Sequence, residues 1–135
     1  MKTFSKIQVD DLIGIPFKLG GKDHKGIDCY GLVQFIYKRE KGIFLPEVDH
    51  GTYEGQVVDG VIKKIRGKFE RIECPETLSI VTFSIKRPYV HHVGVVLNDT
   101  NKFIHVLSKR FVTVERLNSI EWEPKIRGYY NWKIN

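Results

Sequence analysis

Cys29 is the side chain in this sequence best placed to act as a nucleophile. It follows Asp28, whose carboxylate can accept hydrogen bonds from the unpaired backbone N–H groups of a first helical turn, so a helix is predicted to begin at Cys29. A thiol in that turn lies at the positive end of the helix dipole, which favours the thiolate and lowers the thiol pKa below the free value of about 8.5. The alternative is a small buried cysteine packed under the helix, which is a common use of this residue type.

Two histidines on neighbouring predicted strands can supply the base that such a thiol needs. Strands are predicted over residues 92–97 and 102–107, on either side of a turn at 98–101. If this turn is symmetric, Gly94 lies opposite His105, and His92 shares a face with His105 as a diagonal neighbour about 7–8 Å away. His91 then points to the other face. A bulge or an odd-length turn would reverse this parity and favour His91.

Together these residues have the chemistry of a cysteine hydrolase. Cys29 attacks a carbonyl carbon, His92 acts first as base and then as acid, and His105 holds His92 in its orientation and tautomer. Two alternatives remain open: a pair of partly buried histidines with no catalytic role, and a zinc site made of the same three side chains. No short pair of ligands with metal-site spacing is present, so neither a metal nor another cofactor is expected.

Helices are predicted in the first half of the chain. The main one runs over 29–41, where apolar residues recur on one face and Lys41-Gly42 provides a basic last turn and a closing glycine. A short helix is predicted over 7–13, with Ile7, Val9, Leu12 and Ile13 available to the core, and a further one over about 53–66.

Strand-like alternation replaces this pattern from residue 78 onward. Strands are predicted over 78–85, 92–97, 102–107, 110–116 and 126–132. The expected fold class is therefore α+β, with N-terminal helices packed on a C-terminal antiparallel sheet of about five strands. The length and the 41% hydrophobic content fit one domain spanning residues 1–135.

A glycine-containing loop precedes the predicted nucleophile. In residues 14–23, proline fixes one backbone angle, and the pair Gly20-Gly21 permits a tight turn or a close backbone approach. Because this loop leads directly to Asp28-Cys29, it is expected to form one wall beside the thiol. The alternative is an ordinary glycine turn.

Charge and composition limit the possible partners. The net charge of +6 favours anionic surroundings, which could be nucleic acid, anionic lipid or an acidic cell-wall polymer, and the charge alone does not choose among them. The Lys and Arg residues are scattered, and no nucleic-acid motif is present. Nucleic-acid binding is therefore not expected. Membrane insertion is not expected either, because no apolar run is long enough to span a bilayer. The first residues lack the pattern of a secretory signal, so synthesis in the cytoplasm without export by that route is expected. Cys29 and Cys74 are expected to be reduced.

Several segments taken in order resemble the NlpC-type cell-wall peptidases. They are Gly14-Ile-Pro-Phe-Lys-Leu-Gly-Gly21, Gly26-Ile-Asp-Cys-Tyr-Gly-Leu-Val33, Gly42-Ile-Phe-Leu-Pro46, His92-Val-Gly-Val-Val-Leu97 and Phe103-Ile-His105. The tyrosine after the cysteine and the closing segment 122–130 are more similar to the bacteriophage tail-tip branch of this family.

The resemblance implies a papain-like fold and hydrolysis of peptidoglycan stem peptides, commonly between D-γ-glutamate and a diamino acid. It implies Cys29 as nucleophile, His92 as base and His105 as the orienting residue, with Asp28 helping to bind the substrate amine. A tail-tip member is carried in a virion beside other tail proteins and acts at the bacterial cell wall.

Departures from the family pattern also lie in the expected substrate site, which is lined by Phe17, Gly21, Asp28 and Tyr30. The family usually has tyrosine at the position of Phe17 and serine at that of Tyr30, and its usual Gly-Asp turn is replaced near Glu76. Two other functions therefore stay open: a catalytically silent structural component of a tail tip, and another thiol hydrolase or transferase, such as an amidase or a deamidating toxin, on a related fold.

Overall fold

The main helix is capped by the residues that the sequence indicates. The computed structural model describes residues 6–47, 67–84 and 92–133, and its helix α1 spans Cys29–Lys41. Asp28 accepts a hydrogen bond from the backbone N–H of Gly31 at 2.6 Å, and Gly42 closes the helix in the left-handed conformation with φ of 66°. The predicted helix is confirmed. Its buried residues are Cys29, Tyr30, Gly31, Leu32, Val33, Ile36 and Tyr37.

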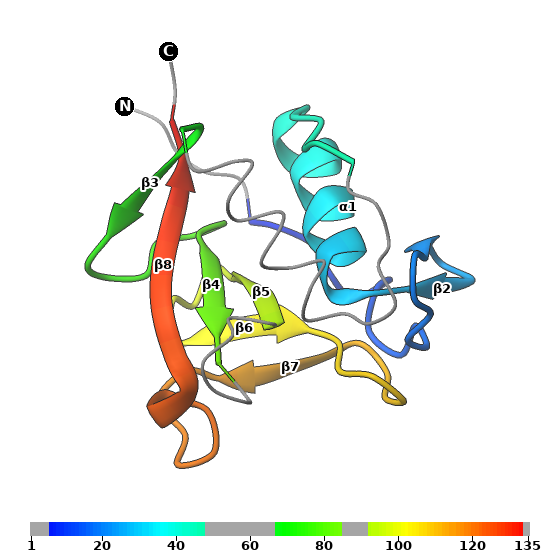
Figure 1. Ribbon diagram of the computed structural model, residues 1–135. Helices are drawn as coiled ribbons and strands as arrows, with labels where there is room; N and C mark the ends of the chain where they lie inside the picture. The colour runs from blue at the N-terminus through cyan, green and yellow to red at the C-terminus, as the bar shows by residue number, and fades with distance from the viewer. Residues whose placement is uncertain (1–5, 48–66, 85–91, 134–135) are drawn as a thin grey trace.

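A six-stranded antiparallel sheet forms the other main part of the described chain (Figure 1). Its order is β3-β8-β4-β5-β6-β7, so the C-terminal strand lies between β3 and β4. The bounds are Phe69–Ile72 for β3, Ile80–Phe83 for β4, His92–Val96 for β5, Lys102–His105 for β6, Thr113–Arg116 for β7 and Ile126–Trp132 for β8. The 3-10 helix η1, Glu123–Lys125, leads into β8. The α+β class is confirmed, with one strand more than expected.

The register of the β5–β6 hairpin follows from its turn. Val95 pairs with Ile104 and Val96 with Phe103, and the N–H of Leu97 donates to the carbonyl of Lys102 at 2.9 Å. This is the symmetric register predicted from the sequence, and it decides which side chains of the two strands share a face.

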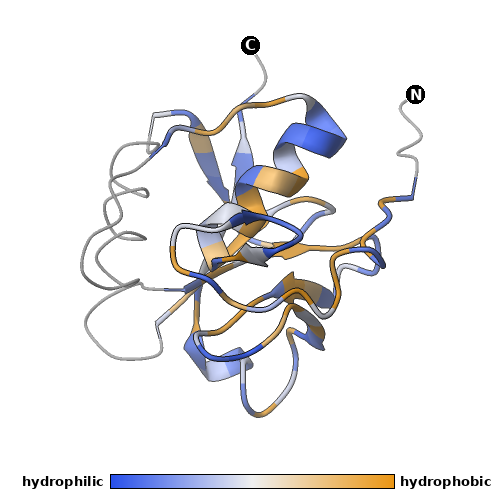
Figure 2. Cartoon of the chain, turned by 90° about the vertical axis from the view of Figure 1, so that its right-hand side faces the viewer, coloured by the Kyte–Doolittle hydropathy of each residue, from blue (hydrophilic) through white to orange (hydrophobic). Residues whose placement is uncertain are grey.

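The described residues form two apolar clusters against the sheet. The larger cluster packs α1 and the N-terminal segment against β-strand residues such as Val93, Val95 and Ile104. The smaller cluster joins Val81, Phe83, Val96, Phe103, Leu117 and Trp122. In Figure 2, the apolar colour is concentrated on the central strands and on part of α1, while the last turn of the helix is hydrophilic. Among the described residues, no helix is long and apolar enough to cross a membrane.

The described secondary structure departs from the sequence-based prediction in two respects. The helix predicted over 7–13 does not form: residues 7–9 have no regular secondary structure and residues 10–14 form turns, and Ile13 is 49% exposed rather than part of the core. A two-stranded hairpin, β1 (Lys22–Asp23) and β2 (Gly26–Ile27), and the strand β3 were not predicted. The helix predicted over 53–66 lies outside the described residues.

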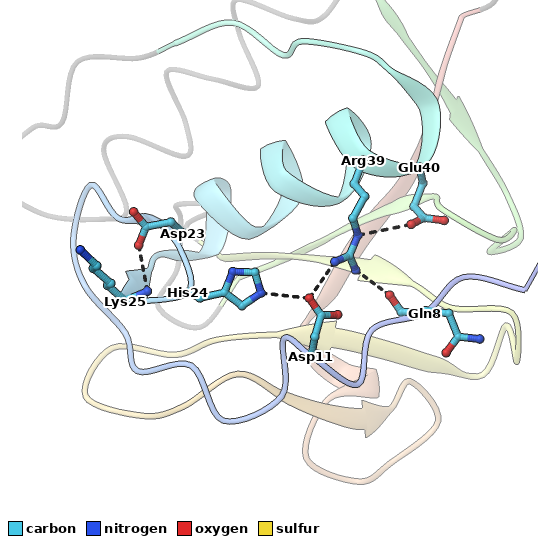
Figure 3. Close-up of polar contacts among 7 residues, drawn as sticks. All are labelled: Gln8, Asp11, Asp23, His24, Lys25, Arg39 and Glu40. Atoms are coloured by element: carbon cyan, nitrogen blue, oxygen red, sulfur yellow. Dashed lines mark hydrogen bonds and ion pairs between the residues drawn. The ribbon is translucent and has the colours of Figure 1, made fainter.

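Polar contacts tie the N-terminal segment to α1 and to the turn of the β1–β2 hairpin (Figure 3). The carboxylate of Asp11 accepts hydrogen bonds from Arg39 at 2.8 Å and from the Nε2 atom of His24 at 2.9 Å. Arg39 also donates to the backbone carbonyl of Gln8 at 2.6 Å. The segment is thus held from two sides.

Candidate active site

The cysteine lies at the start of α1, held there by contacts of the preceding residue. Cys29 is 1% exposed. One carboxylate oxygen of Asp28 accepts the N–H of Gly31 at 2.6 Å, and the other accepts the N–H of Gly20 at 2.8 Å. Asp28 therefore caps the helix and also fixes the glycine-containing loop to it.

The loop lies directly against the first turn of α1. The carbonyl of Gly21 accepts the N–H of Asp28 at 3.2 Å, and a Cβ atom on Gly31 would lie only 2.2 Å from that carbonyl oxygen. A Cβ atom on Gly21 would in turn lie 2.3 Å from the carbonyl oxygen of Gly26. Close backbone approach explains the glycines here, and it places the loop as a wall beside the helix start, as predicted.

Phe17 and Tyr30, two residues expected to line the substrate site, are part of the packing around this loop. Phe17 bridges to Ile27 and is partly buried against the larger apolar cluster. Tyr30 is 4% exposed, and its hydroxyl donates to the carbonyl of Pro46 at 2.6 Å. Burial, followed by the charge of Glu47, raises the pKa of Tyr30 far above its ordinary value, so the hydroxyl stays protonated. Tyr30 thus joins the helix start to the segment that leaves the helix.

The two histidines are in direct contact, and a carboxylate extends the contact across a third strand. The Nε2 atom of His92 lies 2.8 Å from the Nδ1 atom of His105. The Nε2 atom of His105 lies 2.6 Å from a carboxylate oxygen of Glu115. His92 begins β5, His105 ends β6 and Glu115 lies in β7, so the chain of contacts crosses adjacent strands.

Aromatic side chains enclose this pair of imidazoles. Trp122 stacks on His92 with ring centroids 5.9 Å apart, and its ring meets His105 at 85° with a separation of 4.8 Å. Phe83 lies 5.5 Å from His92, and Phe103 lies 4.5 Å from His105. The exposed fractions are 1% for His92 and 0% for His105, so the hydrogen bond between them is shielded from water.

Burial controls the charge of the second histidine. Desolvation lowers the pKa of His105, and the hydrogen bond and charge of Glu115, with a smaller contribution from the charge of Glu121, oppose this effect. Because desolvation is the larger influence, His105 is a neutral imidazole near neutral pH, with one N–H donor and one lone-pair acceptor.

The structure brings His92 and His105 together, and it packs α1, which begins with Cys29, against β5, which begins with His92. His91 lies outside the described residues. The zinc alternative loses support because both ring nitrogens of His105 are engaged, by His92 and by Glu115. Within the described ranges, no group of three or more His, Cys, Asp or Glu residues is arranged to hold a metal ion. Cys29 and Cys74 are both free thiols, as predicted.

Two residues of the site were not found from the sequence. Glu115 and Trp122 reach the histidines from segments that follow β6, and their spacing from His105 carries no motif. The alternation of residues 113–116 predicts that Glu115 lies in a strand. Its contact with His105 depends on the register between β6 and β7, in which Glu115 lies opposite Phe103 and is a diagonal neighbour of His105.

The helix α1 begins with a cysteine and packs against an antiparallel sheet that carries two histidines. Solved structures share this α+β fold. The fold is shared by an NLP/P60 family protein similar to lipoprotein from Staphylococcus aureus, with TM-score 0.66, 25% identity and coverage of 92% of this chain and 38% of that chain. An NlpC/P60 family protein from Bacillus cereus also shares it, with TM-score 0.67, 22% identity and coverage of 96% and 41%.

Residues 14–131 match the model of the NlpC/P60 family, and the chain belongs to this family. A curated relative, murein DD-endopeptidase MepS/murein LD-carboxypeptidase of Escherichia coli, is 30% identical over 118 residues, which are 87% of this chain and 56% of that protein. The gamma-DL-glutamyl hydrolase of Bacillus subtilis is 27% identical over 126 residues, 90% of this chain and 27% of that protein. The chain thus spans about half the length of the first of these relatives and about a quarter of the length of the second.

Proposed function

We propose that this domain is a cysteine peptidase that hydrolyses the stem peptides of peptidoglycan, with the D-γ-glutamyl bond to a diamino acid as its substrate bond. The observation that carries the proposal is the placing of Cys29 as the first residue of a capped helix, on a helix packed against the strand whose first residue, His92, is hydrogen-bonded to His105. This combination provides a nucleophile, a base and an orienting group.

The reaction follows acyl-transfer chemistry. His92 takes the proton of the Cys29 thiol, and the thiolate attacks the carbonyl carbon of the substrate. The backbone N–H of Cys29 is the expected donor to the oxyanion, because it lies at the N-terminus of α1. His92 then protonates the leaving amine, which departs as a thioester forms. His92 then deprotonates a water molecule, which attacks the thioester carbonyl. The tetrahedral intermediate expels the Cys29 thiolate, which His92 reprotonates, and the carboxylate product leaves.

The choice of substrate rests on the relatives and on charge. One relative is named a murein DD-endopeptidase and LD-carboxypeptidase, which supports a peptidoglycan peptide as the substrate, and another is named a gamma-DL-glutamyl hydrolase, which supports a γ-glutamyl bond. The net charge of +6 suits a polyanionic cell wall. Asp28, Phe17, Gly21 and Tyr30 surround the helix start, and we expect them to shape the substrate site from there.

We propose further that the domain acts at the bacterial wall as part of a bacteriophage tail tip, beside other tail proteins. The features that support this are Tyr30 and the closing segment 122–130, which resemble that branch of the family. Detection of the protein in purified virions with a specific antibody tests the location. Its absence from virions of the phage that encodes it would remove this part of the proposal.

The activity is tested with purified peptidoglycan fragments and detection of newly released amines. We expect release by the wild-type protein and a loss of at least about 10³-fold in Cys29→Ala, because the nucleophile is removed. Cys74→Ser is the matched control, since Cys74 is an exposed thiol outside the site, and it should keep wild-type activity. Equal release by the wild-type and Cys29→Ala proteins would refute the proposal.

The same samples separate the remaining alternatives. Because Cys29 is buried, the groups that cover it must move for substrate to enter, and a reactive site predicts alkylation of Cys29 by iodoacetamide below pH 7 in the Cys74→Ser protein. A thiol that stays unreactive, together with no product, would favour a structural tail component. The mass of the product distinguishes a peptidase from an amidase or deamidase.

A further inference from the structure

The carboxylate of Glu115 ends the chain of contacts that begins at His92, and the reaction above assigns it no role. Its oxygen lies 2.6 Å from the Nε2 atom of His105, whose Nδ1 atom lies 2.8 Å from the Nε2 atom of His92. We infer that Glu115 is a positioning residue that fixes the tautomers of both histidines, so that His92 presents its Nδ1 atom as the base. This inference deepens the proposed function and rests on it for its catalytic meaning.

The tautomers follow from the donors and acceptors along the chain. A carboxylate has only acceptors, so the hydrogen bond to Glu115 requires the proton of neutral His105 to be on Nε2. The Nδ1 atom of His105 then carries a lone pair and accepts a hydrogen bond from the Nε2–H of His92. With its proton on Nε2, a neutral His92 has its basic lone pair on Nδ1.

Without Glu115, no acceptor holds the proton of His105 on its Nε2 atom. His105 could then carry its proton on Nδ1 and donate it in a hydrogen bond to Nε2 of His92. A neutral His92 would then carry its own proton on Nδ1, and that atom would no longer have a lone pair to act as base. In a serine-protease triad, loss of the carboxylate that fixes the tautomer costs about 10⁴-fold in kcat. Glu115 acts through one further imidazole and its side chain is 33% exposed, so we expect a smaller loss of about 10- to 100-fold.

A second carboxylate near the pair provides a matched control. Glu121 raises the pKa of His105 through its charge, whereas Glu115 acts through both charge and a hydrogen bond. Glu121→Gln removes a charge of the same sign from the surroundings of His105 and leaves the contact with Glu115 in place. A role of Glu115 through charge alone predicts similar effects of the two substitutions, while a positioning role predicts different ones.

The test combines spectroscopy and kinetics in the full chain carrying Cys74→Ser. Two-bond ¹⁵N–¹H correlation spectra of protein with ¹⁵N-labelled histidine report the tautomer of each ring. We expect the Nε2–H form for both histidines in the parent protein and in Glu121→Gln, and a mixture in Glu115→Ala. The kcat of Glu115→Ala should fall about 10- to 100-fold with little change in KM, and its Cys29 alkylation should show an altered pH profile. Glu115→Gln keeps an acceptor oxygen and should restore part of both properties.

Two results would overturn the inference. One is a proton on Nδ1 of His105 in the parent protein, and the other is unchanged tautomers and kcat in both Glu115 variants. If the parent protein releases no amine from peptidoglycan fragments, yet its Nε2–H tautomers are lost in Glu115→Ala, the proposed substrate is wrong and the positioning role of Glu115 stands.

Discussion

Asp28 stabilises two segments with one side chain. Its two carboxylate oxygens accept the N–H groups of Gly31 and Gly20, at 2.6 and 2.8 Å, and the residue is 3% exposed. A helix cap alone would need one of these contacts. The second contact fixes the loop that lies beside Cys29, so Asp28 sets the position of the helix start relative to one wall of the site.

Substitution of Asp28 tests this double role. We expect Asp28→Ala to lower the free energy of unfolding by about 1.5–3 kcal/mol, because a cap is worth about 1 kcal/mol and a second, partly buried N–H loses its partner. Asp28→Asn keeps one acceptor oxygen and should show a smaller loss. Urea unfolding of the three proteins measures both values. A loss in Asp28→Ala no larger than that of an ordinary exposed cap would contradict the role of the Gly20 contact.

The candidate site residues that the sequence indicates are those whose positions depend on local context. Asp28 and Cys29 are neighbours at a helix start, and His92 and His105 are related by one short, symmetric turn. Glu115 depends instead on the connection between β6 and β7, which contains Lys109 in a left-handed conformation with φ of 64°. A lysine gives no sequence signal for that conformation, so the register could not be derived.

At the scale of elements, the first turn of α1 and the preceding loop are packed too closely for a side chain. A Cβ atom on Gly31 would lie 2.2 Å from the carbonyl oxygen of Gly21 and 3.0 Å from a carboxylate oxygen of Asp28. Helix propensity favours alanine over glycine by about 1 kcal/mol, so the two effects have opposite signs. The contact with the backbone should win, because a carbonyl cannot move aside as a flexible side chain can.

We therefore expect Gly31→Ala to destabilise the protein by about 1–3 kcal/mol, despite the gain in helix propensity. Gly67→Ala is the matched control, because a Cβ atom there would have nothing within 4 Å, and its stability should be equal or slightly higher. Thermal and urea unfolding measure both. A stabilised Gly31→Ala protein would show that the loop can withdraw from α1.

Elements were predicted well where local residues mark their ends, and poorly where pairing with a distant segment determines the secondary structure. The helix α1 has both caps in its sequence, and β8 begins and ends where alternation predicts. Residues 7–13 have helical spacing, but the chain continues into pairing with a distant segment: Gly14 donates to Val112 at 2.9 Å, and Val112 donates to Ile15 at 2.8 Å. Long-range pairing overrides the local pattern, and β3 was missed because its partner is β8.

At the scale of the molecule, a small network of charges holds the N-terminal segment against the body of the domain. Asp11 contacts Arg39 of α1 and His24 in the β1–β2 turn (Figure 3). In the same segment, the backbone N–H of Ile7 donates to the side chain of Asn98 at 2.7 Å. The hydrogen bond from Arg39, followed by that from His24, lowers the pKa of the Asp11 carboxyl below its usual value. The network therefore makes a pH-dependent contribution to stability.

The sign of that contribution leads to the last prediction. Since the pKa of Asp11 is lower in the folded than in the unfolded chain, its stabilising effect is full above the unfolded value of about 3.9 and is lost as the pH falls through the folded value. The side chains of Asp11 and Arg39 are 46% and 33% exposed, so solvent screens the pair and we expect Asp11→Asn to cost less than about 1 kcal/mol at neutral pH. Urea unfolding near pH 7 should show this cost, and the difference from wild type should shrink below about pH 3 and in high salt. Asp10→Asn makes an identical charge change at an exposed neighbour and serves as the control for net charge. An equal pH dependence in both variants would assign the effect to net charge instead of the contacts of Asp11.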